Sequence, residues 1–568
     1  MGDWSPCRSW LTPEPIESSF QWRAPDTVNQ LPLFIADGGM SIQLSRWGLI
    51  GLAVAIVLYM LALLAVSIYA STQVKDEQDF LVAGRRLPLH LSWGALMATW
   101  FGSSAIIGAS KAAWESGLSG VILDPFACSA TLLFTGLVFA SPLWRSNLFT
   151  IADFYRKKFG HRAEYLACLI QLTTFFFWIA SQYIALGSVL QAYFGINKEV
   201  AIIGSAIVVT IYTLIGGMWS VTLTDAIQIV VALIGLVILG YAVMAHIGDG
   251  NVFTGVQTVL AKQPPERLMF VPDWTTFGLL AAIGTFLTGL LGNVPGQDLQ
   301  QRVFTANSPR TASLACILSA AVYFPFGLIP VLLGLAAFSL GMQMPEHDTD
   351  GHMLLPMLAA RFLHEGLVIV FVLAVISIIV SVACSATISE ATILASNVLG
   401  RVKLFEGRHL LLDRICVVLV TIGSVILAFS GESIMSLLDI QLSIAMVALF
   451  VPLVMGVFSR PRNEICGVLA MLLGGGIWGL RYVFETFWYP VPEGFSYARY
   501  PEFVFDTLGG AGGGLIAQLG YWYAWIPSDI QGLVMSFVGY YIGQYCFRHT
   551  PGHFDGDIAP EPETLSAA

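Results

Sequence analysis

Long apolar runs constrain this chain more than any other feature of its sequence. Each run is long enough to cross the roughly 30 Å of hydrocarbon in a bilayer as a helix. Only 11% of the 568 residues are charged, whereas a soluble domain usually has about 25%. This composition excludes a cytosolic enzyme, a nucleic-acid binder and a disordered scaffold, and it predicts an all-α polytopic membrane protein. Thirteen spans are expected near 47–70, 91–113, 119–142, 163–194, 198–216, 219–246, 275–305, 311–341, 366–399, 410–430, 434–458, 464–482 and 527–547.

The basic residues predict the orientation of these spans. Cytoplasmic loops of membrane proteins carry an excess of Lys and Arg. With the N-terminus outside, most of the 27 Lys and Arg residues fall in segments that would face the cytoplasm. One such segment is 293–312, which contributes Arg302 and Arg310. We therefore expect a multi-pass protein of the plasma membrane with an external N-terminus and a cytoplasmic C-terminus.

Two of the apolar runs are interrupted by residues that break helices. The first interruption is Ala98–Ser104, and the second contains Gly292, Pro295 and Gly296. The two interruptions lie five spans apart, and paired broken helices at matching positions are typical of inverted-repeat transporters. Ordinary packing of small residues between membrane helices is the alternative explanation of the same pattern.

Ionisable residues inside the apolar runs mark further candidate sites. A charged group in hydrocarbon costs several kcal/mol, about 2.5–3.5 on insertion scales, unless it is paired or hydrated. Asp225, Glu390 and Asp439 all lie within predicted spans. Asp225 is the strongest candidate because hydroxyl-bearing residues precede it, whereas Asp439 could be interfacial and Glu390 could face a cytoplasmic vestibule.

Three segments resemble signatures of the sodium/solute symporter family. These are Gly216–Gln228, with the sequence GGMWSVTLTDAIQ, Thr150–Tyr155 and Phe80–Arg85. The resemblance covers roughly 45–460 and is nearest to the choline-transporter branch. It implies a leucine-transporter-like fold with a 5+5 inverted repeat and two discontinuous helices. The implied organisation is an extracellular segment 1–46, an extra helix 47–70, a transport core 91–458, trailing helices with an external loop 459–548 and a cytoplasmic tail 549–568.

The resemblance also implies a sodium site. Its implied ligands are backbone carbonyls and hydroxyls at Ala98, Phe101, Ile378, Ser381 and Val382. Val382 departs from the family pattern because its side chain has no oxygen. Ser377, Ser385, Asp225 or water could supply an oxygen instead, and sodium is the coupling ion that the resemblance implies. Proton coupling through Asp225 or Glu390 stays open, and no cofactor is expected.

The substrate positions of the choline branch are matched only in part. Carriers of choline surround the quaternary ammonium with aromatic faces, which attract it by cation–π interactions. Trp100 and Trp178 keep an aromatic ring at two of those positions, whereas Cys128 and Gly296 occupy two others. The incomplete cage argues against choline itself and favours another small organic solute, such as an amino acid or a carboxylate.

The chain is therefore predicted to be a secondary active transporter, and its expected partners are a lipid bilayer and a small organic solute, with no nucleic acid. An ion-independent carrier, a transporter-like solute sensor and a passive channel are the other classes considered. The glycine run Gly509–Gly514 is interpreted as a flexible external loop, and 507–525 as a segment that either spans the membrane or lies at its interface. No enzyme motif is visible in the sequence.

Overall fold

The structure is a computed structural model that describes residues 44–72, 82–271, 274–344, 352–401, 409–429, 433–489 and 500–547. All of these residues belong to one compact unit, Ser41–Ala568. The predicted cytoplasmic tail and nearly all of the predicted N-terminal segment lie outside the described residues. Within the described part the chain is helical, and its only extended pairing is an isolated bridge between Leu87 and Ala306.

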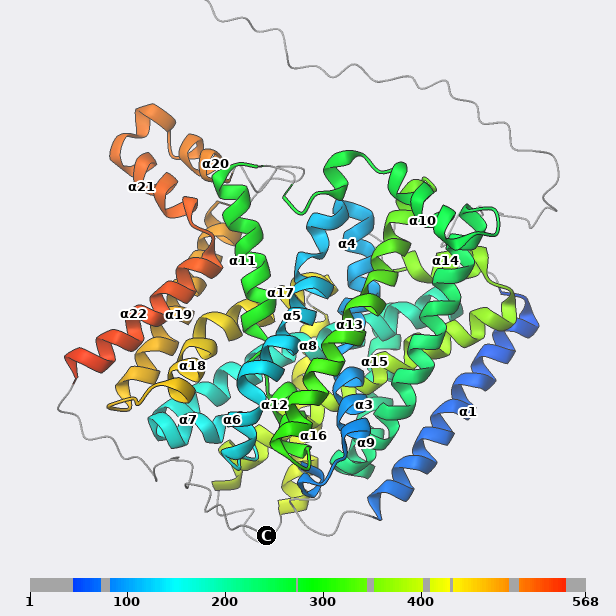
Figure 1. Ribbon diagram of the computed structural model, residues 1–568, viewed down its shortest axis with the longest axis horizontal. Coiled ribbons are helices and arrows are strands. Elements are labelled where there is room, and N and C mark those ends of the chain that lie inside the picture. The colour runs from blue at the N-terminus through cyan, green and yellow to red at the C-terminus, as the bar shows by residue number, and fades with distance from the viewer. Residues whose placement is uncertain are drawn as a thin grey trace, which may run out of the picture. The chain divides into compact units, whose positions relative to one another are not determined.

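The helices follow the apolar runs of the sequence (Figure 1). In chain order they are α1 (Arg46–Ser71), α3 (Leu89–Trp100), η2 (Ser104–Gly108), α4 (Ala109–Ser116), η4 (Ile122–Ala127), α5 (Cys128–Phe134), α6 (Ala140–Arg145), α7 (Ile151–Phe159), α8 (His161–Phe194), α9 (Lys198–Ile247), α10 (Val252–Ala261), α11 (Thr276–Gly292), α12 (Gln297–Thr305), α13 (Pro309–Ser339), α14 (Leu354–Phe362), α15 (Glu365–Ile393), α16 (His409–Ala428), α17 (Ile434–Ala445), α18 (Val451–Phe458), α19 (Ile465–Val483), α20 (Tyr500–Thr507), α21 (Gly514–Trp525) and α22 (Ser528–Cys546).

Ten helical segments of the described chain are long and apolar enough to cross a membrane. The bent pair α11 and α12 makes an eleventh if it is counted as one span. The predicted run 91–113 falls short because α3 is only 12 residues long. The run 527–547 forms α22, which is long enough but contains an aspartate and two glutamines. The total of thirteen spans therefore stays a prediction.

Both predicted helix breaks are confirmed. Helix α3 ends at Trp100, the backbone leaves the helical region at Phe101, and η2 begins at Ser104. Helices α11 and α12 meet at an angle of 41°. A third discontinuity lies in α9, where Gly217 has φ 56° and ψ −163° and so separates two predicted spans by a sharp kink. These three breaks leave backbone groups outside regular helix in the interior of the bundle, which membrane proteins tolerate where the groups meet protein or a cavity.

The glycine run, predicted to be a flexible external loop, contains a short helical turn. Gly510–Gly513 form a short 3₁₀ helix that connects α20 to α21. The turn depends on left-handed backbone angles, with φ 97° at Gly509 and 57° at Gly514. Only glycine adopts such angles without a steric cost, so here the glycines build a tight helical connection instead of a loose one.

Helix α15 lies at the centre of the bundle, and nearly all of its side chains are buried. It packs against α8, α9, α16 and, on the outside, α1. Helix α1 exposes most of its apolar residues, and polar contacts join it to its neighbours. Ser45 Oγ lies 2.8 Å from Glu365 Oε2, Tyr59 hydrogen bonds Ser377, and Ser67 accepts from Ser220 at 2.5 Å.

Candidate functional site

A cluster of polar side chains joins α9, α15 and α3 at the level of the first helix break. The Ser381 hydroxyl on α15 donates to Asp225 Oδ1 on α9 and lies 3.3 Å from the Ala98 carbonyl oxygen at the end of α3. Ser385, one turn further along α15, donates to Asp225 Oδ2 at 3.2 Å. Asp225 and both serines are buried. Three residues that the sequence singled out, Ala98, Asp225 and Ser381, are thus in direct contact.

Arg302 on α12 completes this cluster and pairs with Asp225. Its Nη2 lies 3.4 Å from Asp225 Oδ2 and 2.7 Å from Ser385 Oγ. Its Nε donates to Thr99 Oγ1 at 3.0 Å, and Nη1 contacts the sulfur of Met218. The assignment of Arg302 to a cytoplasmic loop is wrong, because the side chain is buried. This short polar stretch falls both in the predicted span 275–305 and in the predicted cytoplasmic segment 293–312, and it forms the buried helix α12.

The other expected ion ligands lie around the same break. Phe101 ends α3, and Ile378 stands about one turn before Ser381 on α15; both are buried. Val382 faces the break, since a Cβ placed on Gly102 would lie 3.2 Å from Val382 Cγ2. The Gln182 amide oxygen lies beside the same point and accepts from the Ser103 backbone N–H at 3.1 Å. The cluster therefore offers oxygens from Ala98, Ser381 and Asp225, whereas Val382 offers only methyl groups.

Glu390 and Asp439 lie apart from this cluster. Glu390 is fully buried on α15, and neither of its carboxylate oxygens has a hydrogen-bond partner in the described part of the chain. It interacts electrostatically with Asp298 on α12. Asp439 lies on α17, where its side chain is exposed, and it interacts with Asp529 at the start of α22. Neither residue contacts Asp225.

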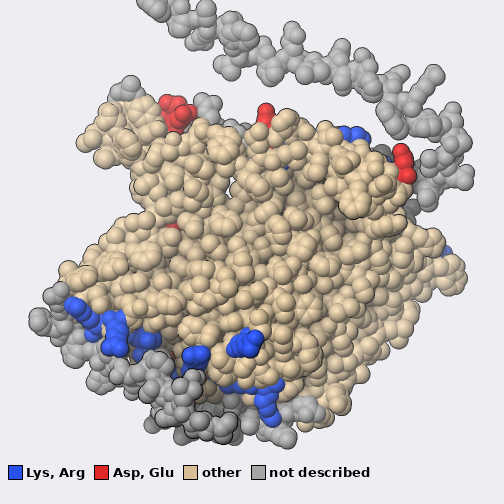
Figure 2. Space-filling model, viewed as in Figure 1, with Lys and Arg blue, Asp and Glu red and all other residues tan. Residues whose placement is uncertain are grey.

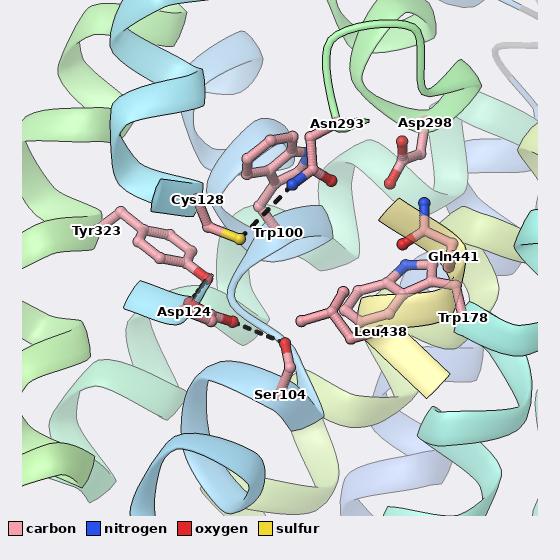
Figure 3. Close-up of a pocket in the computed structure, with 10 residues that line it drawn as sticks. All are labelled: Trp100, Ser104, Asp124, Cys128, Trp178, Asn293, Asp298, Tyr323, Leu438 and Gln441. Carbon is pink, nitrogen blue, oxygen red and sulfur yellow. Dashed lines mark hydrogen bonds between the residues drawn. The ribbon is translucent and has the colours of Figure 1, made fainter. Parts of the chain in front are cut away.

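A small cavity lies between the two helix breaks (Figure 3). It brings together three of the four substrate residues expected from the sequence, Trp100, Cys128 and Trp178. Gly296 does not line it, although residues on both sides of Gly296 do. The full lining is Trp100, Ser104, Asp124, Cys128, Trp178, Asn293, Asp298, Tyr323, Leu438 and Gln441.

Asp124 supplies one acidic group of the cavity, and sequence reasoning missed it. It lies on η4 and is buried, and two neutral hydroxyls hold its carboxylate in place. Ser104 donates to Oδ2 and Tyr323 donates to Oδ1, each at 2.8 Å. The only signal in the sequence was an aspartate inside the apolar run 119–142, because its two partners come from η2 and α13.

Asp298 supplies the second acidic group, from the first turn of α12. Its Oδ1 accepts from the Leu299 backbone N–H at 2.7 Å. Gly296 makes room for this carboxylate, since a Cβ at position 296 would lie 2.9 Å from Asp298 Oδ1. The residue that breaks the expected aromatic cage therefore admits a carboxylate to the cavity wall. The lining of the cavity therefore places two acidic groups beside two tryptophans.

Comparisons with known proteins identify relatives of this chain. A high-affinity choline transporter of Drosophila melanogaster is 28% identical over 74% of this chain and 70% of its own length. The human high affinity choline transporter is 24% identical over 80% of this chain and 82% of its own length.

Solved structures show the same fold. A Na+-coupled sialic acid symporter aligns over 86% of this chain and 98% of its own, with a TM-score of 0.67 and 17% identity. A nucleobase-cation-symport-1 family transporter aligns over 84% of this chain and 95% of its own, with a TM-score of 0.51 and 11% identity. The fold is therefore that of leucine-transporter-like symporters. Residues 80–474 match the profile of the sodium:solute symporter family. This chain belongs to the sodium:solute symporter family, whose members are membrane transporters and not enzymes.

Proposed function

We propose that this protein couples the entry of sodium to the uptake of a small organic cation across the plasma membrane. The observation that carries the substrate class is the cavity between the two helix breaks, where Asp124 and Asp298 lie beside Trp100 and Trp178. The relatives named as choline transporters support a positively charged solute. Carboxylates attract a cation by charge, and indole rings attract it by their quadrupoles.

Sodium is proposed to bind at the cluster of Ala98, Ser381 and Asp225, with Phe101 and Ile378 as further backbone ligands. The Ser381 hydroxyl lies within hydrogen-bonding distance of both the Ala98 carbonyl oxygen and Asp225 Oδ1. Hard cations such as sodium prefer oxygen ligands, and the Asp225 carboxylate compensates for the missing hydroxyl at Val382. When sodium binds, it replaces the guanidinium of Arg302 as the cation beside Asp225.

Transport is proposed to proceed by alternating access within an inverted-repeat core, 91–458. Both broken helices border the cavity, so a change in angle at either break alters access to it. The charge distribution supports the proposed orientation. Figure 2 shows most of the visible Lys and Arg along the lower edge of the molecule, and most of the visible Asp and Glu along the upper edge beside a smaller basic patch. The last turn of α7 alone carries three basic residues, and we assign that edge to the cytoplasm.

The test is uptake by proteoliposomes that contain the purified protein. Labelled choline, butylamine and putrescine serve as organic cations, with glutamate as an anionic control. We expect an inward sodium gradient to drive accumulation of at least one of the cations but not of glutamate. Replacing sodium with potassium should abolish the accumulation. If no cation accumulates under a sodium gradient, the proposal fails.

Proton coupling is the second candidate, and one observation favours it. The ion cluster lacks the second hydroxyl at Val382 and already holds a guanidinium beside Asp225. The same vesicles separate the two candidates when a pH gradient is imposed without sodium. Accumulation under the pH gradient alone would show that protons, and not sodium, are the coupling ion.

A further inference from the structure

The two acidic groups of the cavity are separated in space and are held in different ways. Figure 3 shows Asp124 and Asp298 on opposite sides of the view, with Trp100 between them. Asp124 accepts one hydrogen bond on each oxygen. Asp298 accepts on Oδ1 from Leu299, and no hydrogen bond to its Oδ2 is found in the described part of the chain. The cavity therefore presents a negative group on two sides instead of one.

The protein itself does not neutralise these two groups by ion pairing. In the described residues neither Asp124 nor Asp298 lies within ion-pair distance of a basic side chain, and no basic residue lines the cavity. Arg302, one turn beyond Asp298 on α12, interacts with it electrostatically. The guanidinium of Arg302, however, donates to Ser385 and pairs with Asp225. Buried charges are ordinarily paired, and a cationic solute in the cavity would supply the counter-charge that both carboxylates lack.

The chemistry of the lining selects among organic cations. A quaternary ammonium has no N–H group and depends on aromatic faces. Two of the expected aromatic positions are occupied here by Cys128 and Gly296. A primary ammonium carries three donors and forms charge-assisted hydrogen bonds with carboxylates. The apolar atoms of Trp100, Cys128 and Leu438 lie in the same lining and suit a hydrocarbon chain. A zwitterionic amino acid would place its own carboxylate close to one of the two aspartates.

We infer that the transported cation is a linear diamine, with one ammonium at Asp124, the other at Asp298 and its hydrocarbon chain against the tryptophans. This inference rests on the proposed function and narrows its substrate class. Gly296 and Asp298 then determine the preference for diamines over monoamines. The glycine makes room for the Asp298 carboxylate, which binds the second ammonium.

The experiment compares solutes that differ only in the second amino group. Unlabelled putrescine and butylamine, which have hydrocarbon chains of equal length, compete with the uptake of whichever labelled cation accumulates under a sodium gradient. We expect putrescine to inhibit at a concentration about tenfold lower than butylamine, because it adds one charge-assisted hydrogen bond. Asp298→Asn should reduce this preference to about onefold, because it removes the carboxylate proposed to bind the second ammonium. Gly296→Ala should reduce it as well, because the added Cβ displaces the carboxylate.

A matched control uses the same chemical change outside the cavity. Asp439→Asn on α17 should leave the ratio of putrescine to butylamine inhibition unchanged, and size-exclusion chromatography in detergent reports whether each variant folds. Equal inhibition by the two amines in the wild type would overturn the diamine inference, as would a ratio that survives Asp298→Asn. In either case sodium-driven uptake of choline or butylamine would still stand, so the proposed function would be unaffected. If no organic cation accumulates under a sodium gradient, both fail.

Discussion

The ion cluster and the cavity hold buried carboxylates in opposite ways. In the cluster, Asp225 faces the guanidinium of Arg302 and two serine hydroxyls. In the cavity, Asp124 accepts from neutral hydroxyls and Asp298 from a backbone N–H. The protein supplies its own cation to the cluster, whereas the cavity depends on a cation from outside. The difference shows that a buried carboxylate can be held either by an internal cation or by neutral donors alone.

The largest effect is expected where the internal pair is broken. Asp225→Asn removes the proposed sodium ligand and leaves Arg302 buried without its counter-charge. Breaking a buried pair in this way costs about 3–5 kcal/mol. We expect a lower melting temperature in detergent and sodium-driven uptake at the level of empty vesicles.

A double variant separates these two consequences. Asp225→Asn combined with Arg302→Gln removes both charges, so it should recover thermal stability but not sodium dependence. If Asp225→Asn alone keeps wild-type sodium dependence, Asp225 is not part of the ion site.

A smaller but clear effect is expected in the cavity. Asp124→Asn keeps the size of the side chain and removes its charge, so affinity for the organic cation should fall about tenfold or more. Tyr323→Phe removes only one of the two hydroxyls that hold Asp124, and we expect a loss of about threefold. Initial rates of uptake over a range of solute concentrations measure both. Equal affinity in Asp124→Asn and the wild type would exclude Asp124 from solute binding.

A gain of affinity is expected at the position that departs from the family pattern. Val382→Thr has nearly the same shape as the wild type and adds a hydroxyl beside the break at Gly102. The half-saturating sodium concentration should fall about threefold, a difference of less than 1.4 kcal/mol. Val380→Thr places the same hydroxyl elsewhere on α15 and serves as the control. A shift of equal size in both variants would mean that the hydroxyl at 382 does not reach the ion.

The smallest effect is expected at Glu390. Its carboxylate makes no hydrogen bond in the described residues, so Glu390→Gln removes no polar contact. We expect sodium-driven uptake to change by less than about twofold, because substitutions that remove no contact have small effects. Loss of transport in this variant, together with uptake driven by a pH gradient in the wild type, would identify Glu390 as the proton carrier and sodium coupling as wrong.

Much of the fold was predictable because its determinants are local. Apolar runs specify spans, and Pro and Gly specify the breaks at Phe101 and between α11 and α12. The contact between Asp225 and Ser381 was accessible only through the resemblance, since they lie 156 residues apart. Arg302 was misplaced because hydropathy alone does not distinguish a polar re-entering helix from a loop. Asp124 was missed because the hydroxyls that hold it lie on two other helices.

Helix α1 connects the exposed apolar surface of the protein to the helix that carries Ser381. Tyr59 bonds Ser377, and Ser377 precedes Ser381 by about one turn of α15. A helix whose apolar surface is largely exposed sets its tilt by the thickness of the surrounding hydrocarbon. Through the Tyr59 hydroxyl, that tilt acts on the row of serines where sodium is proposed to bind. We therefore expect bilayer thickness to affect the proposed sodium site through this contact, so that acyl-chain length alters sodium-driven uptake without any change of residue.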